Sequence, residues 1–152
     1  MALTIRRAHS SDSDALAECI DAAYSIYASR IRDLPAVADG IPEAIEGHRV
    51  WVAQIGEQIV GGLILVPHEE FLLLENIAVR PERSGLGIGR ALIAQAERDC
   101  VDLGLHEIRL STHEAMPENV AIYSRLGWRE TGRSGNKVHM SKQISPGSAR
   151  TS

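Results

Sequence analysis

The chain has 152 residues, of which 44% are hydrophobic and 24% are charged, a composition typical of a single soluble globular domain. Its formal net charge is -4 and its basic residues form no cluster, so it lacks the electrostatic signature of a nucleic-acid-binding protein. No segment approaches the roughly 18 apolar residues of a membrane span, and no signal-peptide run opens the chain, which leads us to expect a cytoplasmic protein without a membrane partner.

The first elements are read from hydrophobic periodicity. Alternation predicts a strand at residues 3–7, and a period near 3.6 then predicts a helix whose apolar face runs from Leu16 to Tyr27. Ser11 and Asp14 have the spacing of a capping box at the start of that helix. Residues 30–48 contain several prolines and glycines, and they predict an irregular connection with a short helix after Pro42. Connections of this length often face a substrate.

The middle of the chain is rich in residues that favour strands. Two runs, 49–55 and 58–66, are joined by Gly56-Glu57 and predict a β-hairpin. A third apolar run, 71–79, ends before Pro81, because proline cannot donate a ladder hydrogen bond. Three consecutive antiparallel strands are the simplest arrangement.

The remainder alternates between helix and strand. Apolar residues from Ile88 to Leu103 share one helical face, and Gly104 is a suitable C-terminal stop. The elements expected after it are a strand at 106–112, a helix at 117–126 and a hairpin of strands at 128–132 and 138–144. Residues 145–152 are expected to be a flexible tail, so the domain is predicted to span 1–144.

The order of these elements predicts an α/β domain with a mixed sheet covered by helices on both faces. The strand, helix and strand at 71–112 supply a parallel crossover. Cys19 and Cys100 both fall in predicted helices and are expected to be buried free thiols. The six histidines have no ligand-like spacing to one another or to the cysteines, so no metal site is expected.

Three alternate glycines, Gly85, Gly87 and Gly89, lie between a predicted strand and a predicted helix. Such a loop can turn successive backbone N–H groups towards an anion at the positive end of the helix, although glycines can also serve only to bend a turn. A dinucleotide site requires Gly-x-Gly-x-x-Gly, and a triphosphate loop requires Gly-Lys-Ser/Thr, whereas Arg90 and Ala91 follow Gly89 here. The sequence therefore argues against both a dinucleotide-binding site and a triphosphate-binding loop.

This stretch resembles the signature motif of the GNAT superfamily of acyl-CoA-dependent N-acetyltransferases. The usual form is Arg/Gln-x-x-Gly-x-Gly/Ala, after a strand that ends in an apolar-x-Val pattern and a proline. The matching positions are Gly87, Gly89, Val79 and Pro81. Ser84 departs from the pattern by occupying the Arg/Gln position, while Arg83 precedes it by one residue.

A second segment, residues 118–128, is similar to the C-terminal GNAT motif. Asn119 and Tyr123 are four residues apart and fall on one helical face, although they could instead be a polar residue at a helix terminus and an aromatic core residue. The resemblance covers nearly the whole chain. It implies a mostly antiparallel sheet of about seven strands in which the two central strands splay apart.

In this fold the resemblance implies that acetyl-CoA lies between the splayed strands and that the backbone of Ile77 and Val79 pairs with its pantetheine arm. The backbone N–H of Ile77 would polarise the thioester. The implied cofactor-binding residues are Ile77, Ala78, Val79, Ser84, Gly85, Leu86, Gly87, Ile88, Gly89, Arg90, Asn119 and Tyr123. Tyr123 has the family position of the acid that protonates the leaving thiolate.

The acceptor amine must be neutral when it attacks. Glu75 is the first candidate for its general base, because this carboxylate interrupts an apolar strand beside the expected cleft, although it could instead face outward. His113 and Glu114 are further candidates for the general base. Candidate substrate contacts are Tyr24, Tyr27 and Arg30 in the long connection, together with the segment from Arg133 to His139.

These features predict an enzyme that acetylates a primary amine of a small molecule by direct attack in a ternary complex. Several alternatives remain: a protein or peptide N-acetyltransferase, a non-catalytic acetyl-CoA sensor or interaction module, and a nucleotide-binding regulator. A homodimer is expected from family analogy alone.

Overall fold

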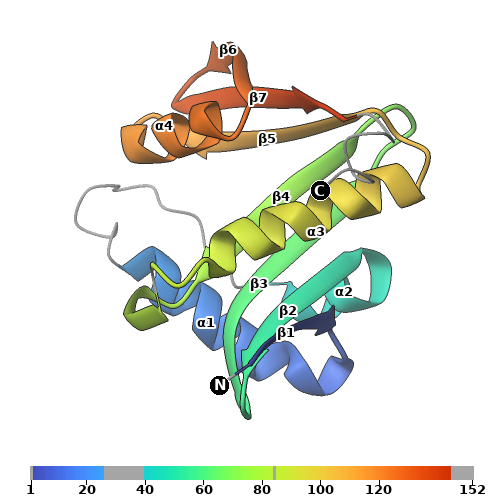
Figure 1. Ribbon diagram of the computed structural model, residues 1–152, viewed down its shortest axis with the longest axis vertical. Helices are drawn as coiled ribbons and strands as arrows, with labels where there is room; N and C mark the ends of the chain where they lie inside the picture. Colours follow the sequence, from blue (N-terminus) through green and yellow to red (C-terminus); the bar gives the residue numbers. More distant parts are fainter. Residues whose placement is uncertain (1, 26–39, 84, 145–152) are drawn as a thin grey trace.

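The computed structural model describes residues 2–25, 40–83 and 85–144 (Figure 1). Its strands are β1 (Leu3–Arg7), β2 (Arg49–Ile55), β3 (Gln58–Pro67), β4 (Leu72–Val79), β5 (Glu107–His113), β6 (Arg129–Ser134) and β7 (Lys137–Gln143). Its helices are α1 (Ser13–Ser25), α2 (Ile41–Gly47), α3 (Ile88–Asp102) and α4 (Pro117–Arg125). Short 3-10 turns, η1 (Ser10–Asp12) and η2 (Pro81–Arg83), precede α1 and the glycine loop. The order of strands and helices expected from the sequence is confirmed.

All seven described strands form one sheet in the order β1-β2-β3-β4-β5-β7-β6. Every neighbouring pair is antiparallel except β4 and β5, which are parallel. That parallel pair has only two partnered positions, Leu72 with Ile108 and Leu73 with Arg109. Beyond them the strands diverge, and in Figure 1 the β5-β7-β6 unit tilts away from β4. The expected mixed sheet with splayed central strands is confirmed.

Helices cover both faces of the sheet and divide the core in two. The larger cluster lies on the side of α3 and α4 and includes Leu65, Leu92 and Met140. The smaller cluster lies under α1 and α2 and includes Leu16 and Ile64. Because each helix contributes one apolar stripe, every helix is held mainly by its tertiary contacts.

One feature of the first helix differs from the sequence prediction. The capping box expected from Ser11 and Asp14 is wrong, because the 3-10 turn η1 intervenes and α1 begins at Ser13. Asp12 fills the role instead: its Oδ2 accepts the backbone N–H of His9 at 2.7 Å, and its carboxylate accepts both terminal nitrogens of Arg6 at 2.8 and 3.0 Å. The hydrogen bond from Arg6 lowers the pKa of Asp12 to about 2.

Helix α3 is fixed to the sheet by a buried carboxylate. Asp99 is 1% exposed, and it accepts hydrogen bonds from the Trp51 indole at 2.7 Å, the Gln95 amide at 2.9 Å and the Arg49 guanidinium at 3.1 Å. These donors compensate the desolvation of the charge. The C-terminal part of α3 is therefore anchored to β2.

A β-bulge in β4 changes which residues face which helix layer. The register pairs Leu74 with Leu65 and Asn76 with Ile64, so Glu75 is the extra residue. Before the bulge, Leu74 belongs to the α3-side cluster; after it, Asn76 lies opposite Ile64 of the α1-side cluster. Periodicity alone could not reveal this switch, because the run 71–79 is apolar on both sides of the bulge.

Cys19 and Cys100 are both buried free thiols, as expected. Across the described ranges, no helix combines the length and apolarity needed to cross a bilayer. In the same ranges, no group of His, Cys, Asp and Glu has the arrangement of a metal site. Residues 145–152, predicted to be a tail, lie outside the described residues.

Candidate functional site

Where β5 has moved away, β4 presents a free backbone edge. The N–H of Arg80 donates to the Val60 carbonyl of β3 at 2.8 Å. Because successive residues of a strand direct their N–H and C=O groups to opposite sides, Val79 and Ile77 direct theirs away from β3 and into the opening. The edge is thus available to pair with an extended ligand.

The glycine loop and the start of α3 form an anion-binding geometry at one end of this edge. Gly85 and Gly87 have φ angles of 82° and 79°, and Gly87 is the N-cap of α3. A Cβ added at either glycine would meet no atom within 4 Å, so the backbone faces open space. The first N–H groups of a helix have no partner within the helix, and here they are at the positive end of the α3 dipole.

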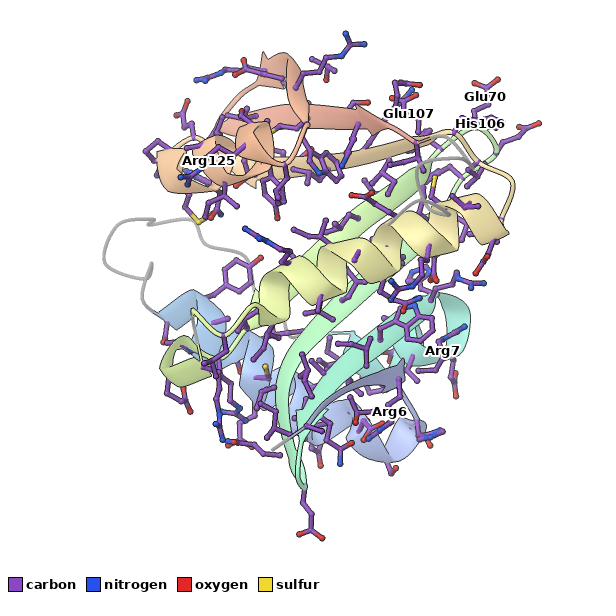
Figure 2. All side chains as sticks on the ribbon, in the orientation of Figure 1. Arg6, Arg7, Glu70, His106, Glu107 and Arg125 are labelled. Carbon is purple, nitrogen blue, oxygen red and sulfur yellow. The ribbon has the colours of Figure 1, made fainter. Side chains whose placement is uncertain are left out.

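A cavity of about 920 Å³ adjoins this loop and is named here the loop cavity. Its lining includes the β4 edge, the glycine loop, the start of α3 and one face of α4. Three guanidinium groups line it, from Arg83, Arg90 and Arg125, and none of its described lining residues is acidic. Figure 2 shows Arg125 on α4, across the opening from the N-terminal end of α3. This local positive charge contrasts with the chain's net charge of -4.

A second cavity of about 550 Å³ lies between the diverging strands and is named here the splay cavity. It is lined by β4 from Leu73 to Ile77, by β5 from Leu110 to His113, and by Lys137 at the start of β7. Its charges are mixed: Glu75 on the β4 wall and Lys137 on the opposite wall. The His113 ring accepts the Ala115 N–H at Nδ1 over 3.0 Å, so the ring proton is placed on Nε2.

The two cavities meet at a set of residues that line both. These are Tyr24, Ile77, Met116, Asn119 and Tyr123. The divergence of β4 and β5 therefore opens a continuous passage from the cationic loop cavity to the walls of the splay cavity, which carry charges of both signs.

Tyr123 is the most constrained side chain at this junction. It is 9% exposed, and its ring contacts the Trp128 ring edge-on, with centroids 5.6 Å apart. Burial raises the pKa of Tyr123, and the nearby Tyr24 adds to that effect. The hydroxyl therefore stays protonated through the neutral range and can act as a proton donor.

Asn119 is held beside Tyr123 by α4 and β5. Its Nδ2 donates to Thr112 Oγ1 at 3.4 Å and contacts Met116 Sδ at 3.7 Å. Pro117 occupies the first turn of α4, where the absence of an N–H is tolerated. The four-residue spacing of Asn119 and Tyr123 thus directs both side chains to the junction.

Comparison with known proteins identifies the fold and the family. A family model described as "Acetyltransferase (GNAT) domain" matches residues 46–130, more than half of the 152-residue chain. The chain belongs to the GNAT acetyltransferase family. N-acetyltransferase 8B of Homo sapiens is 31% identical over 94 residues, which cover 58% of this chain and 41% of that protein. The match thus spans less than half of the relative's length.

Solved structures of N-acetyltransferases support the same fold. PaiA N-acetyltransferase of Thermoplasma acidophilum, in complex with coenzyme A, matches with a TM-score of 0.83 and 19% identity over 95% of this chain and all of that chain. The ribosomal-protein-S18-alanine N-acetyltransferase of Escherichia coli matches with a TM-score of 0.72 and 19% identity over 95% of each chain. At these identities the likeness concerns the fold alone.

Most of the positions predicted for cofactor binding in this GNAT domain come together around one opening. The loop cavity is lined by Ile77, Ala78, Val79, Gly85, Gly87, Ile88, Gly89, Arg90, Asn119 and Tyr123. Leu86 does not line it, and its side chain is 60% exposed. Ser84, Tyr27 and Arg30 lie outside the described residues.

The sequence left open whether Glu75 faces the cleft or faces outward. Its side chain is exposed and also lines the splay cavity. Tyr24 lines both cavities, whereas Glu114 lines neither.

Sequence reasoning missed several residues at the site of this GNAT domain. Arg125 falls on α4 two residues after Tyr123, within the segment that resembles the C-terminal motif but at a position to which the resemblance gave no role. Met116 precedes α4 and lines both cavities, but a lone methionine carries no sequence signal. Asn76 lines the splay cavity only because of the bulge, which is a tertiary feature. Lys137 also lines this cavity, and it falls within the segment 133–139 that the sequence offered as substrate-facing.

Proposed function

We propose that this GNAT domain transfers an acetyl group from acetyl-CoA to a primary amine of a small molecule, by direct attack in a ternary complex. One observation carries the proposal: a cationic cavity with a phosphate-binding geometry meets a second cavity at Ile77 and Tyr123. A free backbone N–H and a protonated hydroxyl are thus both present where two substrates would meet.

The residues of the loop cavity fit coenzyme A. The open space in front of Gly85 and Gly87 admits a diphosphate close to the backbone, and any side chain there would occupy that space. The three arginines that line the cavity can bind phosphate oxygens of coenzyme A that the loop backbone does not reach. The β4 edge at Ile77 and Val79 would pair with the amide groups of the pantetheine arm.

Backbone and side chains of this chain would then supply the catalytic groups. The Ile77 N–H would donate to the thioester carbonyl oxygen as negative charge develops on it, an interaction worth about 3 to 4 kcal/mol in such sites. The Tyr123 hydroxyl would donate its proton to the departing thiolate, which is consistent with the raised pKa of Tyr123.

The acceptor amine has to lose a proton before it attacks. For an amine with a pKa near 10.4, this costs about 4 to 5 kcal/mol at pH 7. Glu75 is the carboxylate that lines the splay cavity, and its exposure allows water to connect it to an amine at the junction. We assign it the role of general base, acting directly or through a water.

Direct transfer is favoured over a covalent acyl-enzyme. The only cysteines, Cys19 and Cys100, are buried and line neither cavity. Burial raises the pKa of both thiols to about 11, which leaves little reactive thiolate at neutral pH. The splay cavity, at about 550 Å³ between sheet walls, has the scale of a small-molecule site.

The experiment is to measure release of free coenzyme A thiol from acetyl-CoA over a panel of small primary amines. Thermal stabilisation of the protein by acetyl-CoA is measured alongside. Amine-dependent thiol release is the expected result. Stabilisation without turnover of any amine would instead identify a sensor, and stabilisation by ATP or NAD but not by acetyl-CoA would identify a nucleotide-binding regulator.

A further inference from the structure

Resting on the acetyl transfer proposed above, we infer that the acceptor is an amine that also carries a carboxylate, held across the splay cavity between Glu75 and Lys137. The chain has two lysines, Lys137 and Lys142, and both lie on β7. The Lys142 ammonium is paired with Glu97 at 3.0 Å, whereas the side chain of Lys137 makes no hydrogen bond or ion pair with any residue of the described ranges. The ammonium of Lys137 is therefore available to a ligand.

The Glu75 carboxylate, on the opposite wall of the splay cavity, is also available to a ligand. This carboxylate makes no hydrogen bond or ion pair with the part of the chain that the structure describes. The β-bulge places it on β4, while Lys137 is paired with His113 in the β5-β7 ladder. Because β4 and β5 diverge beyond Leu73 and Arg109, the two charges approach the cavity from separate walls. A ligand with two opposite charges matches this arrangement.

Asn76 determines which end of such a ligand lies against β4. The residue is 8% exposed and lines the splay cavity, and its Oδ1 is buried with no hydrogen-bond partner. An unpaired buried acceptor is costly, and an amine N–H can satisfy it. Asn76 and Glu75 together form an acceptor pair for an amine, directly beside Ile77, whose N–H would activate the thioester. The amine end therefore belongs at β4 and the other end at Lys137.

The single positive charge on the far wall selects a carboxylate. A phosphate monoester carries nearly two negative charges at neutral pH, and Lys137 is the only lysine or arginine among the described residues that line the cavity. A diamine or polyamine would bring a second ammonium towards Lys137, and like charges repel. A neutral alkylamine would leave Lys137 without a partner.

The test uses three amines of matched length and similar basicity: 4-aminobutyrate, n-butylamine and 1,4-diaminobutane. We expect 4-aminobutyrate to have the highest kcat/KM by about fivefold to tenfold, mainly through a lower KM. This is the size of effect that a single partly exposed ion pair, here between the carboxylate and Lys137, can contribute. Lys137→Gln should remove that advantage, so that kcat/KM for 4-aminobutyrate falls to about the value for n-butylamine with the same variant. Lys137→Glu should reverse the order in favour of 1,4-diaminobutane.

Lys142→Gln is the matched control, since it removes the same charge from the same strand at a position that lines neither cavity. It should leave the ranking of the three amines intact. Equal kcat/KM for 4-aminobutyrate and butylamine, or a Lys137→Gln loss shared by all three amines, would overturn the carboxylate inference and leave acetyl transfer standing. Absence of thiol release with all three, while another amine of the panel is acetylated, would overturn the carboxylate inference alone. Absence of thiol release with every amine of the panel, despite stabilisation by acetyl-CoA, would overturn both.

Discussion

The loop cavity and the splay cavity are built in different ways. The loop cavity takes most of its lining residues from one stretch of chain, the end of β4, the glycine loop and the start of α3, and the glycine loop presents backbone N–H groups. The splay cavity takes its polar side chains from segments that are distant in sequence: β4, β5, α4, and β7 with the residue before it, together with Tyr24 of α1. Backbone geometry suits a cosubstrate that is always the same molecule. Side chains on separate strands can be exchanged by mutation, and they therefore suit an acceptor that varies from one enzyme to another.

The strongest test of this contrast is Gly87→Leu. A side chain at Gly87 would enter the loop cavity, and the φ angle of 79° is unfavourable for any other residue. We expect acetyl-CoA affinity to fall by more than about 1,000-fold, equivalent to about 4 kcal/mol, measured by isothermal titration calorimetry.

Gly104→Leu is the matched control for Gly87→Leu. Gly104 has a φ angle of 74°, its added Cβ also meets open space, and it lines neither cavity. Its variant should lose similar stability but keep its affinity for acetyl-CoA. Equal affinity losses in the two variants would mean that backbone strain, and not the loop cavity, is responsible.

Tyr123→Phe probes the junction where the cavities meet. The ring and its contact with Trp128 are retained, and the hydroxyl makes no hydrogen bond to any residue in the described ranges, so the fold should be undisturbed. We expect kcat to fall roughly 100-fold with little change in acetyl-CoA affinity, because the proton donor is lost. Unchanged kcat in steady-state assays would remove Tyr123 as the acid.

The pH dependence of the wild type follows from the same residue. Because burial raises the pKa of Tyr123 in the folded state, its neutral form is present throughout the neutral and mildly basic range. Its contribution to stability is complete below the unfolded pKa of about 10 and is lost as pH rises above it. Activity should therefore show no decline from Tyr123 ionisation below pH of about 10.

The same contrast explains what could be predicted from the sequence. Local patterns specified the order of elements and the glycine loop, because periodicity and positive-φ glycines act over a few residues. The bulge at Glu75, and with it the position of Asn76, was missed, because the pairing of Ile64 with Asn76 is a long-range choice. Asp12 replaced the expected cap because Arg6, on a neighbouring strand, pairs with it.

Arg125→Gln tests a part of the loop cavity that local sequence patterns did not reveal. Removing one of three guanidinium groups from an open cavity should weaken acetyl-CoA binding by roughly threefold to tenfold, and the effect should shrink as salt is raised. Arg129→Gln is the control, because Arg129 lies outside both cavities. Equal losses in the two variants would attribute the effect to net charge.

The smallest functional effect is expected from Asp12→Asn, which lies outside both cavities. Asparagine keeps an oxygen for the His9 N–H but loses the charge that binds Arg6, which should cost about 1 kcal/mol and lower Tm by roughly 2 to 4 °C. Since the pKa of Asp12 is lowered to about 2, its contribution is present above the unfolded value near 4 and is lost as pH falls towards 2. The stability difference between wild type and variant, measured by urea unfolding, should therefore shrink across that window. A difference that stays constant there would assign the stabilisation to packing at η1 and not to the ion pair.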